Sequence, residues 1–402
     1  MSQGGPAVGQ PADNLGHAST SARVLWSALT IAGGVALAVI PAASVSIAAR
    51  LFDPAGQGLV AVAVLVAMFV GQLAFAILVE SRLSSVGTGR RVVFPRWLAI
   101  VGIGVAVILA AMPPSPWMLA IGLPVLVAAL EVGRGVSIAE HLDQRELIAS
   151  VCVGGGALIG VLLGLVHSRW AVAALVIGIA VACVVRAMPV PHTASPADER
   201  VRGWVVADTA LTGVVLPLVS VLILGALGPI DTVRFTAIST VSGLLAIPLN
   251  FMRVRLLKAH STLDIVVTST AVAAAVVVLL IANLAGAFGW VFGSAWDPAV
   301  LTIPLLIACA WRAASLLTTV PFAALRRAGA ARLVTVLRGV VSLLTFGLAV
   351  TGVWFGSMIG ASGMFPGSLF GALIGLLLAE LGSAALYAAA QRRFGDSERF
   401  AG

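Results

Sequence analysis

The sequence predicts an all-α integral membrane protein with about twelve transmembrane helices in two six-helix bundles. Of its 402 residues, 60% are hydrophobic and 10% are charged, whereas soluble proteins carry about 25% charged residues. The apolar residues form continuous runs of about 20, the length of a bilayer-spanning helix, without the alternating polarity of a membrane β-barrel. The composition excludes a soluble enzyme, a secreted disulfide-rich domain and a disordered protein. Because the basic residues are spread over short loops, nucleic acid is not an expected partner.

Twelve apolar runs justify the helix count. Each is separated from the next by a short polar, glycine-containing or proline-containing segment, and the third is short because it runs into the Pro113-Pro114 turn. The predicted spans are 24–49, 57–79, 97–112, 117–133, 147–166, 170–188, 204–227, 235–252, 265–287, 298–320, 333–354 and 366–390.

The distribution of arginine predicts the orientation. If residues 1–23 are cytoplasmic, the Lys and Arg residues gather at the cytoplasmic ends of the spans, with four exceptions: Arg50, Arg169, Arg234 and Arg312. Basic residues are retained on the cytoplasmic side of a membrane. We therefore expect a multi-pass protein of the cytoplasmic (inner) membrane with both termini in the cytoplasm. Most tryptophans fall near span ends, where indole prefers the interface, but Trp311 lies within a span beside Arg312.

The longest polar segment between apolar runs, 189–203, lies near the middle of the chain and predicts two halves. We expect a disordered cytoplasmic leader (1–23), an N-terminal six-helix bundle (24–188), a cytoplasmic linker (189–203), a C-terminal six-helix bundle (204–390) and a cytoplasmic tail (391–402). Ala-Leu-Thr recurs at 28–30 and 210–212, and Pro41 and Pro217 lie within the first span of each half. Such duplication is typical of transporters whose bundles rock about a central site, although a biased composition also repeats such residues by chance.

No catalytic, cofactor or metal motif is present. The sequence lacks a phosphate-binding glycine loop, a zinc-protease helix motif and a nucleophile elbow, so we expect neither enzymatic activity nor a cofactor. Cys152, Cys183 and Cys309 lie within spans at no metal-ligand spacing. They are interpreted as small buried hydrophobic residues.

Charged residues at membrane depth are the candidate substrate-binding residues. Arg312 and Glu380 each lie about 14 residues, or about 21 Å, from the outer end of their spans. Either they neutralise each other between helices, or Arg312 faces a cavity and binds an anionic group of a substrate. Asp208 near the inner end of the seventh span is a further candidate, unless it reaches the interface. Gln72 in the second span is another, unless it bonds across helices.

Arginines at the cytoplasmic ends of the second and eighth spans form a second candidate group. Arg82 ends the second span, and Arg253 and Arg255 end the eighth, the corresponding position in the other half. They either reflect orientation and attraction to anionic lipid headgroups, or they capture a lipid-linked phosphate through bidentate guanidinium contacts.

Three local features and the predicted topology resemble polysaccharide flippases, of the O-antigen translocase type, in the multidrug/oligosaccharidyl-lipid/polysaccharide exporter superfamily. These features are A-R-L-F-D-P-A-G-Q-G-L-V-A-V-A-V (49–64), the basic loop that follows the second span, and A-A-L-R-R-A-G-A-A-R-L-V (323–334). The resemblance implies alternating-access transport of a lipid-linked oligosaccharide or polysaccharide precursor across the cytoplasmic membrane. It also implies a cavity lined by the first, second, seventh and eighth spans. The partners would be the lipid-linked glycan and membrane lipids, with enzymes of glycan synthesis as further candidates.

Two alternatives remain. A major-facilitator exporter of small molecules also has two six-span halves, and S-R-L-S-S-V-G-T-G-R-R (81–91) keeps Gly89, Arg90 and Arg91 of its loop motif but lacks the Asp-Arg. A non-transporting membrane partner of an envelope-synthesis complex would share the topology alone.

Overall fold

A computed structural model describes residues 39–83, 91–140, 142–189, 199–246, 248–249, 256, 262–327, 330–360 and 367–400. Within these ranges the chain is helical and contains no β-strand. Eight helices are long and apolar enough to cross a membrane, and three shorter apolar helices accompany them. The predicted all-α membrane fold is confirmed.

The helices follow the predicted spans closely. The N-terminal half contains Val39–Leu51, α2 (Pro54–Phe75), the π-helical turn η1 (Ala76–Glu80), α3 (Ser81–Leu83), α4 (Arg96–Ala111), α5 (Pro116–Ala139), α6 (Asp143–Leu165) and α7 (Trp170–Arg186). The C-terminal half contains α8 (Glu199–Gly213), α9 (Val215–Leu227), α10 (Pro229–Gly243), α12 (Thr262–Leu284), α13 (Ala287–Phe292), the 3₁₀ turn η2 (Gly293–Ala295), α14 (Pro298–Arg327), α15 (Ala331–Gly360) and α16 (Gly367–Phe400).

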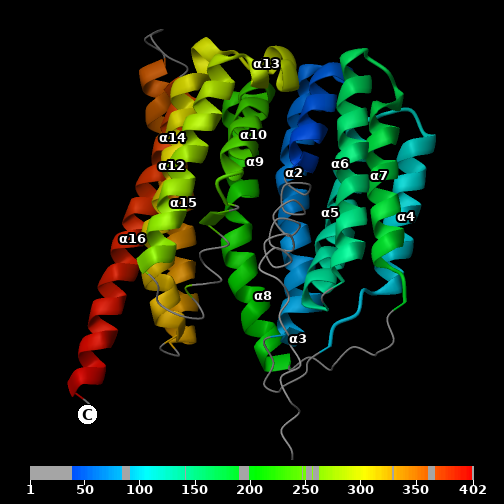
Figure 1. Cartoon of the computed structure of the whole chain (residues 1–402). Helices are drawn as coiled ribbons and strands as arrows, with labels where there is room; N and C mark the ends of the chain where they lie inside the picture. Colours follow the sequence, from blue (N-terminus) through cyan, green and yellow to red (C-terminus); the bar gives the residue numbers. More distant parts are fainter. Residues whose placement is uncertain are drawn as a thin grey trace, which may run out of the picture.

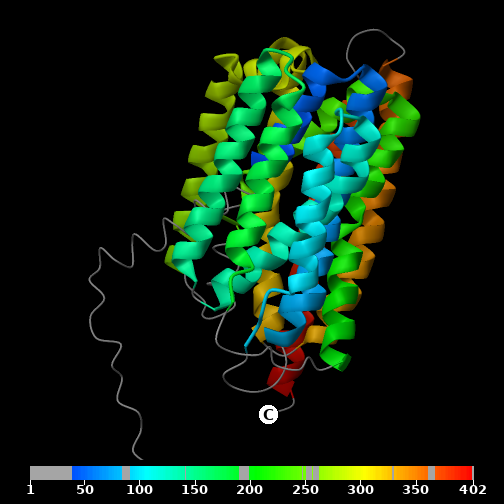
Figure 2. The ribbon, with the colours of Figure 1, turned by 90° about the vertical axis from the view of Figure 1, so that its right-hand side faces the viewer.

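The helices lie side by side along one common direction, so the bundle has two ends (Figures 1 and 2). We term the end that carries the 91–95 and 187–189 turns the inner end, because the sequence predicts it to be cytoplasmic, and the opposite end the outer end. In Figure 1, α14, α15 and α16 lie on one side and α4 to α7 on the other. Between them α2 packs on α5 of its own half and on α8, α9 and α10 of the other.

Local sequence signals explain where the outer turns fall. Asp53 caps α2, its Oδ1 accepting a hydrogen bond from the Gly56 amide at 3.0 Å, and Pro54 occupies the first turn, positions that suit these residue types. Gly228 ends α9 at φ 89°, a conformation that glycine adopts without steric cost. The short Asp/Pro/Gly segments of the sequence therefore form tight turns.

Pro217 interrupts the seventh predicted span. The span divides into α8 and α9, with Val214 between them. A proline cannot donate the backbone hydrogen bond to the residue four positions earlier, here Gly213. The span is therefore interrupted one turn before its proline. The corresponding Pro41 lies close to residue 39, where the described part of its helix begins.

The two halves approach each other closely at the outer end. A Cβ on Gly58 of α2 would lie 2.7 Å from the Pro229 Cβ at the start of α10. The absence of a side chain there lets α10 pack directly on α2. Nearby, the Thr236 hydroxyl of α10 donates to the Ala61 carbonyl of α2 at 3.4 Å.

The exposed surface is apolar, as a lipid-facing surface must be. Tryptophans at helix ends are more than half exposed, which fits the predicted interfacial position; they are Trp97, Trp117, Trp170, Trp204, Trp290 and Trp354. Trp296 differs, because it is buried and its indole donates to Asn283 at 2.8 Å.

The predicted domain boundaries are covered only in part. Residues 1–23 and 190–198 lie outside the described residues, and residues 391–400 continue α16 as helix. The division into two six-helix bundles, with its leader, linker and tail, stays a prediction.

Candidate functional site

A polar cavity of about 240 Å³ lies among helices of the C-terminal half, within the inner half of the bundle. We term it the hydroxyl cavity, because four Ser/Thr hydroxyls and a Tyr phenol line it. Its lining residues come from α8, α14, α15 and α16: Thr212, Ser315, Thr318, Thr319, Phe322, Arg338, Val341, Glu380 and Tyr387.

Glu380 is the sequence-predicted carboxylate that the structure places in this cavity. It extends from α16, and its Oε1 accepts a hydrogen bond from the Thr318 hydroxyl of α14 at 2.6 Å. An ionised carboxylate can accept about four hydrogen bonds. A single hydroxyl therefore leaves acceptor capacity that faces the cavity.

Asp208 lies at the inner side of the same region. Its carboxylate forms an ion pair with Arg338 of α15, whose side chain is 14% exposed. The Arg338 guanidinium also lies 4.6 Å from the centre of the Phe322 ring, and Phe322 meets Tyr387 edge-on with the ring centres 6.1 Å apart. Acid, guanidinium and aromatic groups are thus combined at one wall of the cavity.

Arg312 does not form an ion pair with Glu380, although the sequence predicts that the two lie at matching depth. Both residues are described, and no ion pair within 4.0 Å joins them. Instead the Arg312 guanidinium lies 4.1 Å from the centre of the Trp311 ring, and its Nε has no hydrogen-bond partner within the described part of the chain. The neutralising ion pair considered from the sequence is therefore not formed.

Gln72 approaches the same region from the N-terminal half. A Cβ on Gly213 of α8 would lie 3.3 Å from the Gln72 Oε1 of α2, and the preceding residue, Thr212, lines the hydroxyl cavity. Gln72 is placed where the two halves face each other.

Of the second candidate group, Arg82, Arg253 and Arg255, only Arg82 lies within the described residues. Arg82 lines a different cavity in the N-terminal half, and Arg253 and Arg255 lie outside the described residues. The grouping of the three arginines therefore stays a prediction.

Of the nine described residues that line the hydroxyl cavity, sequence reasoning named only Glu380 as a candidate. Arg338 and Tyr387 are two of those it missed. Arg338 was counted among the cytoplasmic arginines, although it lies five residues inside an apolar run. Tyr387 is the only tyrosine of the chain, which was a signal that could have drawn attention to α16. Both positions required knowledge of which helix faces meet.

A second buried charge cluster at the inner end of α5, α6 and α7 was also missed. Glu146 accepts hydrogen bonds from Arg186 Nε at 3.0 Å and from Nη2 at 2.6 Å, and a further one from Ser150. The Arg186 Nη1 donates to the Leu130 carbonyl. The hydrogen-bonding groups of Glu146 and Arg186 are therefore mostly occupied by other protein groups.

The outer end is held closed by polar contacts between the halves. The Arg50 guanidinium donates to the Val291 carbonyl at 2.6 Å and to the Trp290 carbonyl, both in α13. The Ser46 hydroxyl also donates to the Val291 carbonyl. A charged donor on two carbonyls makes stronger hydrogen bonds than neutral groups do.

Comparisons with known proteins agree on the fold. No protein-family model and no curated protein matches the sequence. The structure is similar to an inward-facing multidrug resistance MATE family transporter of the MOP superfamily, with a TM-score of 0.58 and 14% identity over 90% of this chain and 95% of that one. It is also similar to MATE in complex with MaL6 (TM-score 0.51, 13% identity, 93% and 96% covered) and to MATE in the straight conformation (0.50, 16%, 93% and 95%). At these identities the similarity shows a shared membrane fold.

Proposed function

We propose that this protein is a transporter that moves a lipid-linked oligosaccharide or polysaccharide precursor across the membrane by alternating access. The observation that carries the proposal is the hydroxyl cavity, a polar site that hydroxyls and the Glu380 carboxylate line in the inner half of the C-terminal helices. Polar groups at membrane depth are costly and are usually kept for a substrate or ion path. The fold supports a transporter, since the similar solved structures include a multidrug resistance MATE family transporter of the MOP superfamily.

The contacts at the two ends support alternating access. Arg50 and Ser46 join the halves at the outer end, whereas the hydroxyl cavity lies toward the inner end. Transport would require the Arg50 contacts to break while the inner side closes. Because Pro217 already divides the span that lines the cavity, that span can bend there without losing a further backbone hydrogen bond.

The lining of the cavity favours a sugar. The hydroxyls of Thr212, Ser315 and Thr319 donate to carbonyls of their own helices and keep acceptor lone pairs. Together with Glu380 they can accept hydrogen bonds from the hydroxyls of a sugar. At about 240 Å³ the cavity is smaller than pockets for drug-sized ligands, which measure about 300–1,000 Å³. It would hold one part of a glycan headgroup while the lipid stays in the bilayer.

An exported organic cation is the second candidate, because Glu380 is a carboxylate with spare acceptor capacity near aromatic rings. One contact weighs against it. Arg338 already lies over the Phe322 ring, so this ring face is not open to a second cation.

Reconstituted transport tests the proposal. Purified protein in liposomes receives a fluorescent lipid-linked disaccharide, and a membrane-impermeant reagent quenches the outer-leaflet fraction over time. We expect faster exchange between leaflets than in protein-free liposomes. Glu380→Gln should reduce the rate about tenfold, which corresponds to about 1.4 kcal/mol of lost stabilisation.

The control is Thr270→Val in α12, because this hydroxyl is exposed and bonds only to the Val266 carbonyl of its own helix. It should leave exchange unchanged. Exchange no faster than in protein-free liposomes would reject a flippase. Uptake of a tetraalkylammonium ion without glycan exchange would then establish the cation exporter, and the absence of both activities would leave the non-transporting membrane partner.

A further inference from the structure

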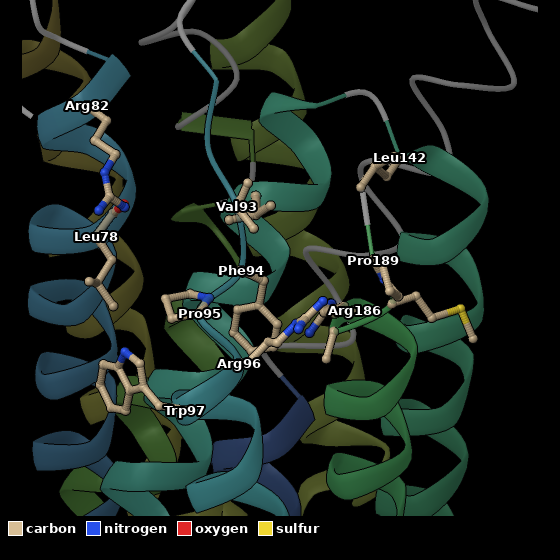
Figure 3. Close-up of a pocket in the computed structure, with 13 residues that line it drawn as sticks. Leu78, Arg82, Val93, Phe94, Pro95, Arg96, Trp97, Leu142, Arg186 and Pro189 are labelled. Atoms are coloured by element: carbon tan, nitrogen blue, oxygen red, sulfur yellow. The ribbon is translucent and has the colours of Figure 1, made fainter. Parts of the chain in front are cut away.

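A second cavity of about 460 Å³ opens at the inner end of the N-terminal half. Its lining residues lie between positions 78 and 189, whereas those of the hydroxyl cavity lie between positions 212 and 387. We term this second cavity the arginine pocket. In Figure 3, Arg82, Leu78 and Trp97 lie on one side, Arg186, Leu142 and Pro189 lie on the other, and Val93, Phe94 and Pro95 lie between them. Its lining residues are Leu78, Arg82, Val93, Phe94, Pro95, Arg96, Trp97, Val136, Leu142, Arg186, Ala187, Met188 and Pro189.

The charge of this pocket is positive. Of the described residues that line it, three are arginines and none is acidic. Arg186 is neutralised, because Glu146 binds it through two hydrogen bonds. Arg82 and Arg96 are not neutralised, because neither forms an ion pair with the described residues. The Arg82 Nε is buried without a hydrogen-bond partner among them, and its Nη1 donates only to the Leu78 carbonyl. Two guanidinium charges therefore remain for an anion.

The beginning of α4 adds to this positive field. The helix starts at Arg96, its N-cap is Pro95, and Pro95 makes no side-chain capping hydrogen bond. The first amides of a 16-residue helix thus lack a side-chain acceptor beside the pocket. Helix N-termini of this kind bind phosphate and other anions through free N–H groups and the helix dipole.

The position of the pocket points to a lipid as the source of the phosphate. Trp97 lines the pocket and is 59% exposed, and Ile100, one turn further along α4, is 69% exposed. An exposed tryptophan marks the headgroup level, and the apolar surface beyond it faces acyl chains. A phosphate at Arg82 and Arg96 would lie at the depth where a headgroup joins its chains.

We propose that the arginine pocket binds the phosphate of an anionic membrane lipid. The phosphate lies against Arg82, Arg96 and the first turn of α4, and the acyl chains follow the exposed face of α4 past Ile100. The site is independent of the hydroxyl cavity, and its occupancy does not depend on the transported substrate. A free phosphate ion shares the chemistry of the headgroup, so the experiment separates the two sources.

Native mass spectrometry of the full chain in nonionic detergent tests this proposal. Phosphatidylglycerol, phosphatidylcholine and inorganic phosphate are titrated separately. We expect phosphatidylglycerol to bind about tenfold more tightly than phosphatidylcholine, a difference of about 1.4 kcal/mol. Arg96→Gln should lower that affinity severalfold, and Arg82→Gln combined with Arg96→Gln should remove the preference. Because Arg96 is exposed, the single variant should fold even if the double variant does not.

Arg392→Gln is the matched control, since it removes one exposed charge from the inner part of α16 without touching the pocket. It should leave phosphatidylglycerol binding intact. An equal loss in this variant would show unspecific attraction and overturn the proposal. Inorganic phosphate that binds as tightly as the lipid and displaces it would assign the pocket to a soluble anion and overturn the lipid assignment.

Discussion

Glu146 and Glu380 are carboxylates on apolar helices, yet their surroundings differ. Glu146 is 6% exposed and is surrounded by hydrogen-bond donors: two nitrogens of Arg186 and the Ser150 hydroxyl. Glu380 accepts one hydrogen bond, from Thr318, and lines a cavity. The first arrangement holds three helices together and offers nothing to a ligand. The second keeps acceptor capacity in an accessible space, which is what a binding site needs.

The same substitution in both places should give the largest contrast. Glu146→Gln leaves Arg186 buried without its counter-charge, and breaking a buried pair costs about 3–5 kcal/mol. Glu380→Gln keeps an oxygen that accepts from Thr318, so we expect a loss of no more than about 1 kcal/mol. Thermal unfolding in detergent, followed by tryptophan fluorescence, measures both. A smaller loss for Glu146→Gln than for Glu380→Gln would contradict the structural role of the first pair.

The outer end offers the next contrast, between two arginines. Arg50 bridges the halves through α13, whereas Arg169 lies 5.1 Å from the ring of its own neighbour Trp170. Arg50→Ala should weaken outer closure and raise the labelling rate of a cysteine placed at Thr236, a buried position between α2 and α10.

Arg169→Ala should leave that rate unchanged. The reagent is a membrane-impermeant maleimide, added from the outer side to protein that lacks its native cysteines. Equal rates in the two variants would mean that Arg50 does not hold the outer end closed.

The smallest expected effect concerns one hydroxyl. Thr318→Val preserves the shape of the side chain and removes the hydrogen bond to Glu380, so it should lower stability by about 1–2 kcal/mol. Thr345→Val is the comparison, because that hydroxyl bonds only to the Val341 carbonyl within α15, and it should change stability by less than about 0.5 kcal/mol. Unfolding curves that rank the two variants in the opposite order would remove Thr318 from the site.

Helix positions and the separation of arginines were predictable, because a bilayer imposes simple rules on length and charge. Glu380 and Asp208 were also found, since carboxylates at or near membrane depth are rare. The predicted alternative of an Arg312–Glu380 ion pair failed for a geometric reason. Counting residues from the span ends fixes neither the depth in the folded bundle nor the rotation around the helix. From Arg312 to Thr318, the partner of Glu380, a helix rises by about 9 Å and turns by about 240°, so the two side chains leave α14 at different depths and on different faces.

The remaining features depend on which faces meet in space. Arg338 reaches Asp208 from a helix 130 residues later in the chain, and no local pattern encodes that meeting. The arginine pocket likewise combines the ends of α3, α4 and α7. Duplication of the halves stays a prediction. The helix is interrupted just before Pro217, but the residues before Val39, where Pro41 would have the matching interruption, are not described.

Accessibility of the hydroxyl cavity tests the central claim most directly. A single cysteine at Thr319, in protein without its native cysteines and reconstituted in liposomes, is exposed to a membrane-impermeant thiol reagent from each side in turn. We expect reaction from the inner, arginine-rich side, and a slower reaction when the lipid-linked disaccharide is present. No reaction from either side, or the same rate with and without the disaccharide, would contradict a transport site at this cavity.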